Sequence, residues 1–202
     1  MVDIKLNEKQ IDALKEVGTV GAGHAAIAMS QMLQAKINMA VVKVEVVPSV
    51  DLNKSIGGDD MLAAGVYIQT LGDLQGGLVM IFEEAHAIKL ANLLLSKYGQ
   101  KATMLTEASL SAIKEVCNII SGSYLSALSQ LIPFKMAMSV PKFTIGQLGT
   151  ILNGIFDEIT QKKGESFGLV TEFVESTNQI KGYFLFLPKL ESLDKILTGL
   201  EV

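Results

Sequence analysis

An internal repeat spans half of this chain, and it limits the folds that the chain can adopt. Residues 12–19, Asp-Ala-Leu-Lys-Glu-Val-Gly-Thr, align with residues 111–118, Ser-Ala-Ile-Lys-Glu-Val-Cys-Asn, ninety-nine positions later. The same offset then pairs Gly23 with Gly122, and further matches continue beyond them. A single period of this length indicates a duplicated half-domain and not a solenoid of short repeats. We therefore expect one domain over residues 1–202, with repeats at 7–99 and 106–200.

Each copy is predicted to begin with a long helix. In the first copy Asn7 is a favourable N-cap, and Gln10 stands at the position that completes a capping box. Apolar residues then follow helical spacing to about Gln34. In the second copy Thr106 is the expected cap, and the apolar pattern runs to Ile132-Pro133.

After each long helix, β-branched and alternating segments predict strands. These segments are Lys43–Val50, Met61–Gln69, Gly76–Phe82, Lys142–Gly146, Phe167–Glu175 and Ile180–Leu187. Closing helices are predicted at Glu83–Tyr98 and Leu190–Leu200, with an additional helix between Leu148 and Ile159. Two copies of helix–strands–helix predict an α+β fold with approximate two-fold symmetry, in which one continuous sheet packs against long helices.

Composition excludes several classes of function. Hydrophobic residues make up 49% of the chain and charged residues 19%, so a substantial core is available. The net charge is −4 and basic residues form no cluster, which argues against binding nucleic acid. The apolar stretch Met61–Ile68 is too short to span a membrane. The single cysteine, Cys117, cannot form an internal disulfide, so we expect a cytoplasmic protein. His24 and His86 lack neighbouring ligands at metal-binding spacing, so no metal site is expected.

A polar stripe interrupts the otherwise apolar second long helix. Ser111, Glu115 and Asn118 follow one another at steps of four and three, which places them on one helix face. A solvent-exposed stripe without a function is one interpretation of this spacing. Asn, however, is a poorer helix former than Ala by roughly half a kcal/mol, which favours another reason for its place within a helix.

The stripe carries a resemblance to a known family. The pattern Asp/Ser, three residues, Glu, two residues, Asn, twenty-two residues, Pro resembles the signature of the CheC/CheX/FliY phosphatases of bacterial and archaeal chemotaxis. Ser111, Glu115, Asn118 and Pro141 satisfy it in full, and the resemblance extends over the whole chain, duplication included. It implies a phosphatase that removes the aspartyl phosphate of a CheY-type response regulator. By the same resemblance, Asn118 would orient the attacking water and Glu115 would pair with a lysine of the receiver. The receiver would carry the Mg²⁺, so the chain would need no cofactor of its own.

The first copy departs from this signature. Asp12 and Glu16 are retained, but Thr19 stands where the family has Asn and Val42 stands where it has Pro. Threonine is shorter and lacks the paired donor and acceptor of a carboxamide, so we expect a degenerate first site and a one-site variant of the family.

The task of Ser111 has two interpretations, and that of Pro141 has one. Ser111 either bonds to its own helix backbone or contacts the receiver. Pro141 is interpreted as structural, because it has no N–H and restricts the backbone at the start of a strand.

The alternative to catalysis is a non-catalytic adaptor that binds the receptor deamidase CheD or the flagellar switch, as the resemblance also implies. Because duplication supplies an internal pairing, we expect a monomer.

Overall fold

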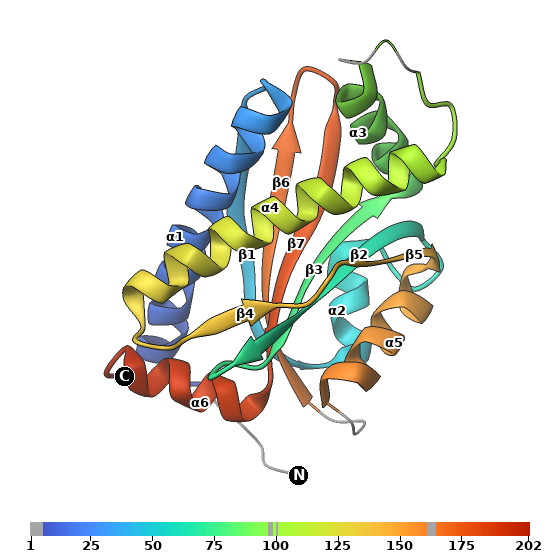
Figure 1. Cartoon of the computed structure of the whole chain (residues 1–202). Coiled ribbons are helices and arrows are strands. Elements are labelled where there is room, and N and C mark those ends of the chain that lie inside the picture. Colours follow the sequence, from blue (N-terminus) through green and yellow to red (C-terminus); the bar gives the residue numbers. More distant parts are fainter. Residues whose placement is uncertain (1–5, 97–98, 100, 161–164) are drawn as a thin grey trace.

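One antiparallel sheet organises the fold, with helices on both of its faces (Figure 1). The computed structural model describes residues 6–96, 99, 101–160 and 165–202. The strands are β1 Ile37–Pro48, β2 Leu62–Gly72, β3 Gly76–Glu83, β4 Met136–Met138, β5 Lys142–Gln147, β6 Glu165–Glu175 and β7 Ile180–Pro188. The helices are α1 Glu8–Leu33, α2 Ser49–Ile56, α3 Glu84–Ser96, α4 Glu107–Leu131, α5 Leu148–Thr160 and α6 Leu190–Gly199.

The strand order is symmetric: counted from either edge, equivalent strands of the two copies occupy equivalent positions. It is β1-β6-β7-β3-β2-β4, and β5 also pairs with β2. The two copies meet at the centre, where β3 pairs with β7 and Met80 lies opposite Phe184. Each copy also gives its outer strand to the other copy: β1 pairs with β6, and β4 and β5 pair with β2. The continuous sheet and the internal two-fold arrangement expected from the repeat are confirmed.

The sheet separates two hydrophobic cores. Alternate residues of a strand point to opposite faces, so Ala64, Val66 and Ile68 of β2 pack toward α1 and α4, whereas Ala63 and Tyr67 pack toward α2 and α5. None of the helices within the described residues is both long enough and apolar enough to cross a membrane.

The long helices begin where the sequence predicts. Asn7 accepts a hydrogen bond from the Gln10 amide at 3.0 Å, and the Gln10 side chain accepts one from the Asn7 amide at 3.1 Å. This is the expected capping box. In α4 the Thr106 hydroxyl accepts from the amide of Ser109. Because helix α4 begins at its predicted cap, the three residues of the polar stripe lie within one continuous helix, as the sequence predicts.

The prediction for the first strand was wrong at both ends. The predicted strand Lys43–Val50 begins instead at Ile37 and ends at Pro48, after which Ser49 starts α2. Pro48 has no N–H with which to extend a ladder, so the chain turns into a helix there. Helix α2 is the counterpart of α5 in the repeat, and the two helices pack together. The helix predicted as additional in the second copy is therefore present in both.

Candidate functional site

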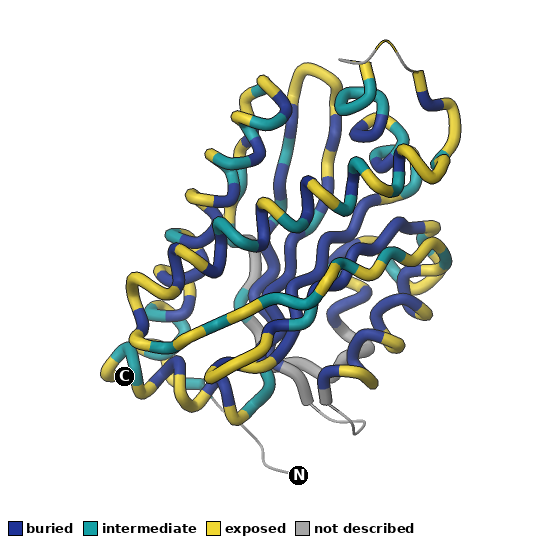
Figure 2. The backbone as a smooth tube through the Cα atoms, viewed as in Figure 1, coloured by how far each residue is buried: buried dark blue, intermediate teal, exposed yellow. Residues whose placement is uncertain are grey.

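Helix α4 presents one face to the core and the other to solvent. Its inner face is fully buried and comprises Ile113, Val116, Cys117, Ile120, Tyr124 and Leu128. Figure 2 shows exposed residues recurring along the outer side of the same helix. Residues three and four positions apart share a helix face, so the three stripe residues lie together. Because Ser111 and Glu115 are exposed, the face that they share is the outer one.

The three stripe residues are accessible and have no partner among the described residues. Ser111 and Glu115 are exposed, and Asn118 is half-buried. Among the residues that the structure describes, none of these three side chains makes a hydrogen bond or an ion pair. The carboxylate is therefore free to accept, and the carboxamide is free both to donate and to accept. For Ser111, the possible bond to its own helix backbone is not formed, in contrast to Ser129, whose hydroxyl donates to the Leu125 carbonyl at 2.9 Å.

Pro141 lies in a bulge of the edge strand beside α4. Thr70 pairs with Met138 and Tyr67 pairs with Lys142, so three residues of one strand lie opposite two of β2. Strand β5 begins directly after Pro141, as expected for a residue without an N–H. The equivalent strand β1 shifts its register between Val41 and Lys43, the matching place in the repeat.

The first copy keeps the exposed stripe but not its chemistry. Asp12, Glu16 and Thr19 are all exposed on α1. The Thr19 hydroxyl donates to the carbonyl of Lys15 at 2.7 Å, so it is directed back along its own helix. Unlike Asn118, Thr19 presents no free donor to a partner protein.

Cys117, the neighbour of Asn118, belongs to the core. Its side chain is fully buried, and burial raises the pKa of its thiol well above its usual range. The thiolate is the reactive form of cysteine, so this residue is unsuited to act as a nucleophile.

We therefore expect native protein to resist thiol-specific alkylation at neutral pH. Labelling should become complete only when the chain is unfolded, because both access and ionisation require opening of the core. Mass spectrometry after a timed exposure to iodoacetamide, with and without urea, measures this. Rapid labelling of native protein would contradict the buried placement.

Within the described ranges, no three His, Cys, Asp or Glu side chains converge in a way that would hold a metal ion. His24 lies on α1 and His86 on α3, and they belong to different surroundings. His86 accepts a hydrogen bond from the Lys181 amide, whereas His24 lines a groove between α1 and α4.

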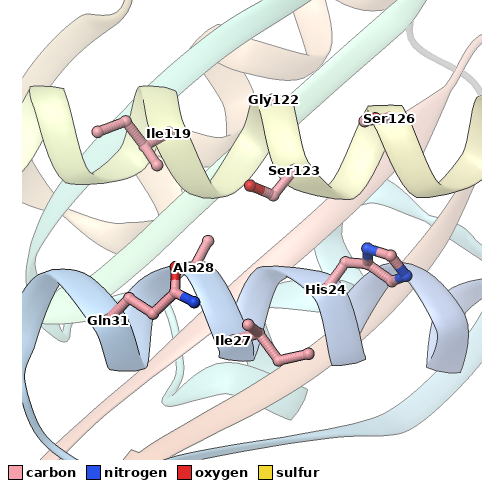
Figure 3. A pocket seen from close by; sticks show the side chains of 8 residues that line it. All are labelled: His24, Ile27, Ala28, Gln31, Ile119, Gly122, Ser123 and Ser126. Atoms are coloured by element: carbon pink, nitrogen blue, oxygen red, sulfur yellow. The ribbon is translucent and has the colours of Figure 1, made fainter.

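Sequence reasoning missed that groove, which has a volume of about 440 Å³. Its lining consists of His24, Ile27, Ala28 and Gln31 from α1 and Ile119, Gly122, Ser123 and Ser126 from α4. Figure 3 shows the two sets of residues on adjacent stretches of α1 and α4, with the side chains of Ala28 and Ser123 between the two helices. The available signal was the run of small residues at 122, 123 and 126, but only the packing of α1 against α4 turns that run into a hollow.

Comparison with known proteins places this fold and stripe in one family. The family model described as the CheC-like family matches residues 109–145, a segment that contains Ser111, Glu115, Asn118 and Pro141. The CheY-P phosphatase CheC of Bacillus subtilis is 31% identical over 199 residues, which are 96% of this chain and 95% of that protein.

Two solved structures share the fold. The crystal structure of Thermotoga maritima FliY matches with a TM-score of 0.79 at 21% identity, covering 98% of each chain. The CheX–CheY–BeF₃–Mg²⁺ complex of Borrelia burgdorferi matches with a TM-score of 0.58 at 18% identity, covering 88% of this chain and 98% of that one.

A duplicated α+β scaffold with an outward Glu–Asn stripe defines the class of protein. The chain belongs to the CheC-like family, as its similarity to B. subtilis CheC over nearly the full length of both chains shows. The family recognised from the sequence signature is thus confirmed.

Proposed function

We propose that this chain is a phosphatase that accelerates hydrolysis of the aspartyl phosphate on a CheY-type receiver in chemotaxis signalling. The observation that carries the proposal is the placement of Glu115 and Asn118. They lie one helical turn apart on the outer face of α4 and make no bond to other described residues. Both groups are accessible to the phosphorylated pocket of another protein.

Asn118 supplies the chemistry in this proposal. Water attacks the phosphorus in line, the P–O bond to the aspartate breaks, and inorganic phosphate and a free carboxylate result. Such reactions depend on positioning and charge stabilisation and need little covalent chemistry from the enzyme. The carboxamide oxygen accepts a hydrogen bond from the attacking water while its NH₂ donates to a phosphoryl oxygen.

Glu115 fixes the orientation of the receiver. An exposed carboxylate one turn before Asn118 is placed to pair with a lysine of the receiver, and that contact sets where the carboxamide enters. Mg²⁺ belongs to the receiver in this scheme, so the chain requires no metal of its own. Ser111, one further turn along the same face, lies at the margin of the contact and is proposed to touch the receiver, because it makes no bond to its own helix.

The comparisons support the proposed phosphatase activity on a CheY-type receiver. The relative from B. subtilis, which matches over 96% of this chain, bears the name of a CheY-P phosphatase. A structural neighbour was solved as a complex of CheX with CheY. We also propose a monomer, because the central β3–β7 junction joins the two copies within one chain.

The direct test is phosphate release from a phosphorylated CheY-type receiver with Mg²⁺, with and without this protein. Faster release in its presence supports the proposal, and an unchanged rate overturns it. The competing adaptor role is distinguished by the same sample: retention of CheD or of a flagellar switch protein, together with an unchanged rate, would favour an adaptor.

The degenerate site offers a gain-of-function prediction. Introducing Thr19→Asn into an Asn118→Ala background is expected to raise the residual rate at least about tenfold, because the carboxamide returns beside the exposed Glu16. The matched control is Thr19→Ala in the same background, which removes the hydroxyl without adding an amide. Equal rates in the two double variants would show that α1 lacks more than the carboxamide.

A further inference from the structure

The groove between α1 and α4 is lined unequally by the two copies. Helix α4, which carries the intact stripe, contributes small residues such as Ser123 and Ser126. At the equivalent repeat positions α1 contributes His24 and Ile27. Both helices therefore line the hollow, and side chains of the degenerate copy form one of its walls (Figure 3).

The groove continues the face that carries the stripe. Ile119 stands four residues after Glu115, and Gly122 stands four residues after Asn118, so each follows a stripe residue on the helix surface. Two large hydrophobic side chains are unusually accessible here: Ile27 is 59% exposed and Ile119 is 37% exposed. Exposed apolar groups rimmed by polar ones are typical of a protein contact surface.

A contact surface of ordinary area, centred on Asn118, is wide enough to include this groove. A standard interface buries about 800 Å² on each partner, equivalent to a disc of roughly 16 Å radius. At about 1.5 Å of rise per residue, such a disc centred on Asn118 reaches roughly ten residues along α4 and includes Ser126. Packed helices lie only about 8–10 Å apart, so Ile27 and Gln31 of α1 fall within the same disc.

We infer that the α1–α4 groove is part of the docking surface for the receiver and that Ile27 and Ile119 are its apolar contacts. The inference rests on the proposed function, whose substrate is the receiver. The degenerate copy thereby keeps a task in recognition: its helix α1 supplies one wall of the substrate-binding surface, and the stripe on α4 acts on the phosphate.

These contacts lie away from the reacting atoms, which determines their kinetic signature. A contact made equally before and during the reaction strengthens binding of the receiver without changing the chemical step. Loss of the Ile27 or Ile119 contact should therefore raise KM while leaving kcat nearly unchanged. A catalytic residue such as Asn118 should instead lower kcat.

The test compares Ile27→Asp, Ile27→Ala and Ile119→Ala with wild type in steady-state phosphate release. Ile27→Asp is expected to raise KM roughly tenfold with kcat within about twofold of wild type, and the two alanine variants should shift KM in the same direction by less. Leu131→Asp is the matched control, since Leu131 is 41% exposed on α4 but lies about 20 Å from Asn118 along the helix. Its KM should not change, and thermal unfolding confirms that each variant is folded.

Binding of a beryllofluoride-loaded receiver, measured by calorimetry, separates the two proposals. Weakened binding of Ile27→Asp alongside absent hydrolysis by wild type would leave the docking surface standing and overturn the catalytic role. Hydrolysis by wild type with unchanged KM and affinity in all three groove variants would overturn the docking surface alone. A receiver that does not bind wild type at all would overturn both.

Discussion

Replacing Asn118 with Ala is expected to lower the accelerated dephosphorylation of the receiver about a hundredfold or more. The substitution removes the one carboxamide on the outward stripe, and misplacement of an attacking water by about 1 Å is enough to cost that factor. Ala also favours the helix, so the fold should be retained. Because the carboxamide acts on the attacking water, the fall should appear mainly in kcat.

Single-turnover phosphate release over a range of protein concentrations measures this effect. Gln130→Ala is the matched control: Gln130 is an exposed amide on the same helix, about 18 Å along it from Asn118. It should retain the wild-type rate. Asn118→Asp should be as inactive as Asn118→Ala, because it loses both amide donors and adds a negative charge near the phosphoryl group. An Asn118→Ala rate above a third of wild type would end the proposed mechanism.

Gly21→Ala is expected to destabilise the fold by about 1–3 kcal/mol, although Ala is usually the better helix residue. A Cβ at Gly21 would stand 2.5 Å from the ring of Tyr124. That ring is fully buried and packs against Phe184 and Phe186, with centroids 4.8 Å and 5.8 Å away, so it has little room to retreat. The close approach of α1 to α4 therefore depends on the missing side chain.

Gly23→Ala, on the same helix, is expected to change the stability in the opposite direction. A Cβ there meets nothing within 4 Å, so only the helix propensity changes and stability should rise by up to about 1 kcal/mol. Urea denaturation of both variants, read by the midpoint at unchanged slope, measures the contrast. Equal shifts for the two glycines would show that Tyr124 adjusts freely.

Local signals in the sequence predicted the two long helices well, and the first strand and helix α2 poorly. Asn7 and Thr106 are caps whose bonds are made within a few residues, and both were identified from spacing alone. Strand β1, in contrast, owes its early start at Ile37 to pairing with Glu175 in the other copy, a contact that no local pattern encodes. Helix α2 was missed for a similar reason, because its packing partner α5 lies in the second copy.

For the candidate site too, the sequence predicted the part that depends on local spacing and missed the part that depends on packing. The stripe was visible in the sequence because helical spacing alone places Glu115 and Asn118 together. The groove was not visible, because Ile27 and Ile119 become neighbours of one hollow only through the packing of α1 against α4. The sequence also left Ser111 undecided, since its two options differ in rotamer and not in position.

The exchange of outer strands has a consequence for how the protein is made. Val44 of β1 takes Leu169 of β6 as its partner, more than a hundred residues farther along the chain. At a synthesis rate of about 5–20 residues per second, β1 must wait on the order of ten seconds before its neighbour leaves the ribosome. During that interval a β-rich edge has no native partner, which is the condition under which nascent chains aggregate or recruit chaperones. The duplicated gene thus yields a polypeptide whose halves mature together and not in turn.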